Sequence, residues 1–109
     1  MDSLAFRSLE EKYGDDFNWM DIHENEMYFL AELDSELSES HRLYKKAKAA
    51  IAKCVSKDDV LYLLHDGSYA IVHLTYQKSN TVGFPQHIEF SDLQSALHHI
   101  ENEFVSEYL

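Results

Sequence analysis

The sequence contains little cysteine, proline or glycine, and each shortage excludes a class of protein. Its single cysteine, Cys54, cannot form an intrachain disulfide, so we expect a protein of the reducing cytoplasm rather than a disulfide-stapled secreted domain. One proline and three glycines, with no low-complexity run, leave no candidate linker, and the 109 residues suit a single domain, 1–109. No apolar run approaches the roughly 18 residues that span a bilayer, and the first residues lack a signal-peptide pattern.

Positive charge is also scarce, with 9 Lys and Arg against 20 Asp and Glu and a formal net charge of −11. Nucleic acids and anionic membranes are bound by clustered Lys and Arg, so we expect neither as a partner. The charge is uneven, because residues 1–41 and 58–109 are acidic whereas residues 42–57 carry six bases and no acid. This basic segment either lies against acidic neighbours, presents a patch for an anionic ligand, or is solvated without a role.

The strongest local pattern is the segment 58–76, in which two runs rich in β-branched and aromatic residues flank Asp66-Gly67. Asp-Gly favours a two-residue type I′ turn, because both turn positions require a positive φ. We therefore predict a hairpin with strands at about 60–65 and 69–77. The register set by this turn places the following pairs opposite one another: His65 and Ser68, Leu63 and Ala70, and Leu61 and Val72.

In this register both faces of the hairpin are largely apolar. One face would contain Leu61, Leu63, Ala70, Val72 and Leu74, and the other Val60, Tyr62, Leu64, Tyr69, Ile71, His73 and Thr75. A hairpin with one face in water normally alternates apolar and polar residues, so the second face is either covered or a contact surface. If it is exposed, its candidate residues for binding a partner or a second copy of the chain are Tyr62, Tyr69, Ile71 and His73.

Apolar periodicity adds helices around the hairpin. The predicted helices lie at about 1–13, 26–38, 42–55 and from 91 onward, and a third strand is predicted at about 84–90. The helix at 42–55 would place Cys54 on its apolar stripe, where a thiol is inert. We therefore expect an α+β fold, with a small antiparallel sheet of two or three strands packed by three or four helices.

Seven histidines invite a metal hypothesis, for which His98, His99 and Glu103 are the best local set. Adjacent helix residues point about 100° apart, so these two imidazoles cannot easily bind one ion, and we expect no metal site and no cofactor. His73 could pair with Asp58 or Asp59 as an acid–base couple. Because no nucleophile or phosphate-binding motif accompanies this pair, we assign no catalytic residue.

Three segments resemble motifs of an uncharacterised group of small bacterial proteins, which carry H-P-L-Y, D-D-V-L-F/Y and V-H-L-T-W/Y. In this chain they read His41-Arg42-Leu43-Tyr44, Asp58-Asp59-Val60-Leu61-Tyr62 and Val72-His73-Leu74-Thr75-Tyr76. The resemblance covers about residues 28–92, and the chain departs from it at Arg42 (Pro in the motif) and Tyr76 (often Trp). The resemblance implies a bacterial, cytosolic setting and transfers no activity.

Two functions follow as hypotheses. The first is a protein-binding module without catalytic activity, such as an inhibitor or immunity-type protein that binds a basic partner. Its candidate acidic residues are Glu32, Asp34, Glu36 and Glu39. The alternative is a small enzyme or ligand-binding domain using Tyr62, His73 and Asp59, which requires a pocket in which solvent reaches His73.

Overall fold

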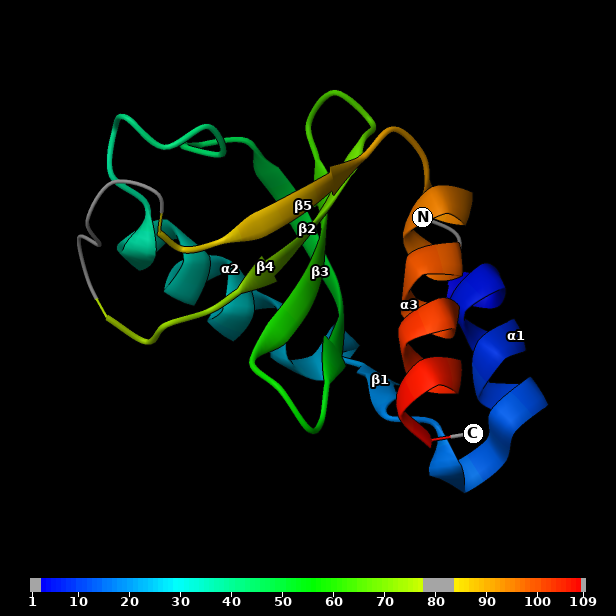
Figure 1. The fold of residues 1–109 in the computed structure, drawn as a ribbon. Coiled ribbons are helices and arrows are strands. Elements are labelled where there is room, and N and C mark those ends of the chain that lie inside the picture. The colour runs from blue at the N-terminus through cyan, green and yellow to red at the C-terminus, as the bar shows by residue number, and fades with distance from the viewer. Residues whose placement is uncertain (1–2, 78–83, 109) are drawn as a thin grey trace.

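Five antiparallel strands form one sheet in the order β1-β2-β3-β4-β5, so that strands adjacent in sequence are adjacent in the sheet. The computed structural model describes residues 3–77 and 84–108 (Figure 1). The strands are β1 (Trp19–Asp21), β2 (Ala47–Cys54), β3 (Asp59–Leu64), β4 (Tyr69–His73) and β5 (His87–Phe90). The chain is α+β, but the prediction of two or three strands is wrong, because β1 and β2 extend the sheet beyond the hairpin and β5.

The described residues contain three α-helices, namely α1 (Ser3–Tyr13), α2 (Glu26–Glu36) and α3 (Leu93–Tyr108). In Figure 1, α1 and α3 lie side by side on one side of the sheet, and α2 lies on the other. Asp92 caps α3, because its Oδ1 accepts a hydrogen bond from the Ser95 N–H at 2.8 Å. None of the helices in the described ranges has the length and apolar character needed to cross a membrane.

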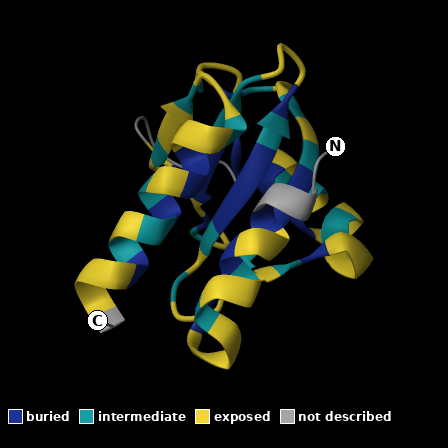
Figure 2. Cartoon of the chain, turned by 90° about the vertical axis from the view of Figure 1, so that its right-hand side faces the viewer, coloured by how far each residue is buried: buried dark blue, intermediate teal, exposed yellow. Residues whose placement is uncertain are grey.

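Each face of the sheet has its own hydrophobic core. The core under α1 and α3 includes Phe6, Leu9, Trp19, Ile51, Leu61, Ile71, Ile100 and Phe104. The core under α2 includes Phe29, Leu33, Val60, Tyr62, Val72 and Leu74. Exposed residues lie mainly on the outer sides of the helices, and buried residues on the sides toward the sheet (Figure 2). Both faces of the hairpin are therefore covered for most of their length.

The turn between β3 and β4 is one residue longer than predicted. The Gly67 N–H donates to the Leu64 carbonyl at 3.0 Å, and the Leu64 N–H donates to the Ser68 carbonyl at 2.8 Å, which closes a three-residue loop. Within the loop Gly67 has a positive φ of 89° and Asp66 does not, so a type I′ turn is not formed. The observed pairs are Leu63 with Tyr69, Tyr62 with Ala70, Leu61 with Ile71 and Val60 with Val72.

This added residue changes which side chains share a face. Side chains alternate along a strand, so a shift of one residue moves a whole strand's set to the opposite face. The predicted faces are consequently wrong: Tyr62 lies in the core under α2, whereas Ile71 lies in the core under α1 and α3.

Residues 42–55 do not form the predicted helix, because they supply a turn and then strand β2. Lys45 in this turn has a positive φ of 58°, and the Lys46 N–H donates to the Leu43 carbonyl at 2.9 Å. Alanines favour a helix locally, but β2 pairs with β1 on one side and β3 on the other, and sheet pairing overrides that weak propensity. Two register shifts between β2 and β3 explain why the apolar spacing did not read as a regular strand.

A carboxylate of α3 links that helix to the end of α1. Both the Lys12 Nζ and the Tyr13 hydroxyl donate to Glu101 Oε2, at 2.7 and 2.6 Å. The bond from Lys12 is the main cause that lowers the pKa of Glu101 below its ordinary value, and the bond from Tyr13 adds to it. The ionised form of Glu101 therefore stabilises the contact between the two helices.

We expect Glu101→Gln to lower the free energy of unfolding at neutral pH and to have little effect in acid. The pKa of Glu101 is lower in the folded than in the unfolded chain, so its stabilisation is complete above 4.5 and is lost as the pH falls through the lowered folded value. Urea unfolding at about pH 7 and about pH 3 measures the difference, with the exposed Glu11→Gln as control. A destabilisation by Glu101→Gln that is equally large in acid would contradict this expectation.

Candidate functional site

The four hairpin residues predicted as a contact surface do not lie together. Tyr62 is fully buried, and its hydroxyl donates to the Phe29 carbonyl at 2.8 Å. Burial raises the pKa of Tyr62 far above its ordinary value, with a smaller contribution from Glu36. Tyr69, Ile71 and His73 lie on the opposite face of the sheet, where Ile71 is core and His73 is exposed at the end of β4. They are separated because the three-residue loop shifts β4 by one residue against β3.

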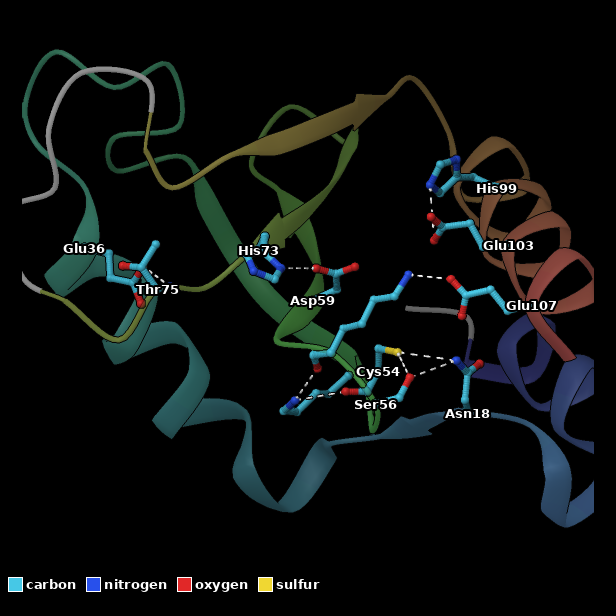
Figure 3. A network of polar contacts seen from close by, with 12 residues as sticks. Asn18, Glu36, Cys54, Ser56, Asp59, His73, Thr75, His99, Glu103 and Glu107 are labelled. Atoms are coloured by element: carbon cyan, nitrogen blue, oxygen red, sulfur yellow. Dashed lines mark hydrogen bonds and ion pairs between the residues drawn. The ribbon is translucent and has the colours of Figure 1, made fainter.

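Among the predicted acidic residues, Glu36 is buried and has a structural role. Its Oε1 accepts hydrogen bonds from the Thr75 N–H and the Thr75 hydroxyl, both at 2.8 Å, and its Oε2 accepts one from the Tyr76 N–H at 2.9 Å. Figure 3 places Glu36 and Thr75 side by side. Glu36 therefore attaches the end of α2 to the chain that follows β4, whereas Asp34 and Glu39 are exposed.

These hydrogen bonds fix an unusual conformation at Tyr76. This residue has a positive φ of 59°, which is rare for a side chain of this size and persists only where the surroundings enforce it. Tyr76 is 43% exposed, and Tyr28 on α2 is 57% exposed. The pKa of Tyr76 is raised, first by partial burial and then by the neighbouring Asp58, Tyr28 and Glu32. We call Tyr28, Glu32, Asp58 and Tyr76 the tyrosine surface.

A second feature lies on the opposite face of the sheet, at the same end of β4. The His73 Nδ1 lies 2.7 Å from Asp59 Oδ1, directly across the β3–β4 pair (Figure 3). Both line a cavity of about 650 Å³ between the sheet and α3, which we call the groove. The other residues that line it are Ile71, Gln86, His87, Ile88, His99 and Glu103.

Two pairs of an imidazole and a carboxylate line the groove. Besides His73 and Asp59, the His99 Nε2 lies 3.5 Å from Glu103 Oε1 on α3. His87 and Glu89 pair with Val72 and Ala70, so their side chains project toward the α2 face. There His87 Nε2 contacts Glu89 at 3.0 Å, and the hydrogen bond from His87 is the main cause that lowers the pKa of Glu89. Within residues 3–77 and 84–108, no three His, Cys, Asp or Glu side chains are arranged to bind a metal ion.

The groove meets one requirement of the alternative hypothesis and fails another. The His73 side chain is 55% exposed, so solvent reaches it, and its pairing with Asp59 resembles the base and orienting acid of a hydrolase. Tyr62 lies on the other face of the sheet, and the lining contains no Ser, Thr, Cys or Lys nucleophile. The predicted set of Tyr62, His73 and Asp59 is therefore not assembled, although two of its members are.

The sequence does not indicate which residues come together in the tyrosine surface or in the groove. Tyr28 and Tyr76 lie in a helix and a motif that were recognised, but their proximity depends on the Glu36 contact, for which the sequence has no signal. His99 and Glu103 stand four residues apart on α3 and were recognised as a pair. Only the folded chain brings them to the groove beside His73.

The segments that carry the resemblance converge near the groove. His41 Nδ1 accepts the Leu43 N–H at 3.0 Å, which leaves Nε2–H to donate to the Pro85 carbonyl at 2.9 Å. The His41 ring lies 5.1 Å from that of His87, which pairs with Val72 on β4. The first motif thus positions the chain before β5, and the Asp59–His73 pair joins the second motif to the third.

The basic residues after position 41 are partly neutralised by acidic neighbours. Arg42 pairs with Glu89, and Lys57 Nζ lies 2.7 Å from Glu107 Oε1. The hydrogen bond to Glu107 is the main cause that raises the pKa of Lys57. These contacts favour the interpretation that the basic segment serves the fold, and they weaken the case for a patch that binds an anion.

Comparisons with known proteins add no further constraint. No protein-family model, no curated protein and no solved structure matches the chain. Its function must therefore be inferred from its own side chains.

We expect Glu36→Ala to lower the free energy of unfolding by about 3 kcal/mol or more, because it leaves several partly buried donors without their charged acceptor. Glu36→Gln keeps the shape and one acceptor oxygen, so its loss should be smaller. The exposed Asp34→Ala on the same helix is the matched control and should change stability by less than about 0.5 kcal/mol. Urea unfolding measures all three, and a Glu36→Ala protein as stable as the control would refute the structural role of this carboxylate.

Proposed function

We propose that this chain is a non-catalytic protein-binding module that uses the tyrosine surface to bind a basic protein. The observation that carries the proposal is the presence of two exposed tyrosines, Tyr28 (57%) and Tyr76 (43%), beside carboxylates on a chain of net charge −11. Exposed tyrosines surrounded by polar residues are typical of interface centres.

The chemistry of this surface suits Lys and Arg side chains. Tyrosine faces attract cations, and carboxylates pair with ammonium and guanidinium groups. Acidic residues elsewhere, including Asp34 and Glu39, would accelerate the approach of a basic partner and make it sensitive to salt. A second copy of the chain is a poor partner, because two molecules of charge −11 repel each other.

The Glu36 contact also supports the proposal. Binding is costly when a side chain and its backbone must be ordered at the interface. Here the backbone of Tyr76 is already fixed by the hydrogen bond from its N–H to Glu36, so less conformational freedom is lost on binding. Positive φ values at large residues are concentrated at functional positions.

The proposal includes a biological setting. A single buried cysteine is compatible with a reducing cytosol, and the motif resemblance favours a bacterial one. In that setting, an acidic module of this size would serve as an inhibitor or immunity-type protein that covers the cationic site of its target.

We expect Tyr28→Ala/Tyr76→Ala to abolish capture of the basic partner. Loss of an interface tyrosine costs about 2 kcal/mol when it is a hot spot, which is roughly thirtyfold in Kd for each residue. The measurement is affinity capture from bacterial lysate at about 50 mM and about 500 mM salt, because exposed charge pairs are screened over this range. A basic protein captured at low salt alone, and lost with the double variant, is the expected result.

Met20→Ala/Val105→Ala is the matched control, since both residues are exposed apolar side chains outside the tyrosine surface. Circular dichroism confirms that each variant is folded. Capture of the same partner by the tyrosine variant and by the wild type would refute the proposal, as would the absence of any partner at both salt concentrations.

A further inference from the structure

The groove between α3 and the sheet is separate from the tyrosine surface, and it has a ligand chemistry of its own. The geometry points to a binding site for a small organic cation, namely an ammonium group on a short aliphatic chain. Three observations carry this inference: the orientation of His73, the charge of the lining, and an apolar strip on the floor of the groove.

His73 supplies a hydrogen-bond acceptor. Its Nδ1 lies 2.7 Å from Asp59 Oδ1, and a carboxylate acceptor requires the proton of the neutral ring to be on Nδ1. The lone pair is then on Nε2, for which the described residues provide no donor. A ligand N–H can therefore be bound at this nitrogen, with the Asp59 carboxylate close by.

The lining charge is negative. Asp59 and Glu103 contribute two carboxylates, and the residues that line the groove include no Lys or Arg. Lys57 lies close enough to act electrostatically on Asp59 and Glu103, but its Nζ contacts Glu107 at 2.7 Å, so its charge is offset by a third carboxylate. A cation is consequently attracted by the groove, and an anion is repelled.

An apolar strip lies beside these acceptors. Ile71 on β4 pairs directly with Ile88 on β5, so both side chains are on the same face of the sheet. Ile71 is 5% exposed and Ile88 is 47% exposed, so the cover provided by the helices ends between these two strands. An aliphatic chain on this strip would bury Ile88, and a volume of about 650 Å³ is within the range of small-molecule sites.

A metal ion is the competing ligand, because three histidines line the groove. No three ligating side chains of the described residues converge on one point, and the His99–Glu103 distance of 3.5 Å already exceeds a good hydrogen bond. The separation of these groups suits an extended organic molecule better than a single ion.

The test compares three probes of equal chain length, n-pentylamine, n-pentanol and pentanoate, by NMR titration of the whole chain near neutral pH. We expect pentylammonium to shift the resonances of Ile88, His73 and Glu103 at the lowest concentration, with pentanol weaker and pentanoate without effect. Equal or stronger binding of pentanoate would overturn the inference, as would shifts that lie outside the groove. Saturable binding of Zn²⁺ with no response to pentylammonium would replace it with a metal site.

Two variants locate the binding groups. Glu103→Gln removes one carboxylate charge of the lining, and Asp59→Asn removes the other, so each should weaken pentylammonium binding at least severalfold. Asp15→Asn/Asp16→Asn removes charge from the exposed turn after α1 and should bind as the wild type does. Unchanged affinity in both groove variants would overturn the inference. Tyr28→Ala/Tyr76→Ala should retain pentylammonium binding, so failure of either proposal is distinguishable from failure of the other.

Discussion

The middle of the sheet is apolar on both faces, and the rest of the structure depends on covering it. Val60, Tyr62 and Val72 on one face and Leu61 and Ile71 on the other are all buried. Burial of a large apolar side chain contributes about 1.5–3 kcal/mol, so helices are needed on each side to keep these residues from water. α2 covers one face and the pair α1 and α3 covers the other (Figure 1).

The end of β4 is where this cover stops, and the polar groups there have two different roles. Glu36 is buried and satisfied by backbone and hydroxyl donors from Thr75 and Tyr76, so it fixes the chain and positions an exposed tyrosine. His73, the last residue of β4, lies on the face of the sheet toward α3, where it reaches solvent and has Asp59 as its partner. The accessible imidazole thus belongs to the last residue of β4, and the structural carboxylate contact to the chain that follows the strand.

The parts of the fold that were predictable have local signals. Apolar periodicity placed α1, α2 and α3 close to their observed bounds, and the β-branched runs placed β3 and β4. The errors arise where distant contacts decide. An Ala-rich segment became β2 because β1 and β3 pair with it, and Gly67 alone took the positive φ that a two-residue turn demands of both positions. The extra loop residue shifts β4 by one position against β3. It therefore separates Tyr62 from Tyr69, Ile71 and His73, which were predicted to share one face.

Several of the chain's Lys and Arg side chains are paired with carboxylates outside the two surfaces that we propose to bind cations. Lys12, Arg42 and Lys57 each contact a carboxylate, on Glu101, Glu89 and Glu107 respectively. Each of these ion pairs neutralises a carboxylate that would otherwise add to the negative potential of the surface. The negative potential is therefore strongest where carboxylates have no Lys or Arg beside them. The groove lining has no Lys or Arg, and Tyr76 has acidic neighbours at Asp58 and Glu32. The placement of the nine Lys and Arg residues, as well as the net charge, therefore shapes the electrostatic potential on which both proposals depend.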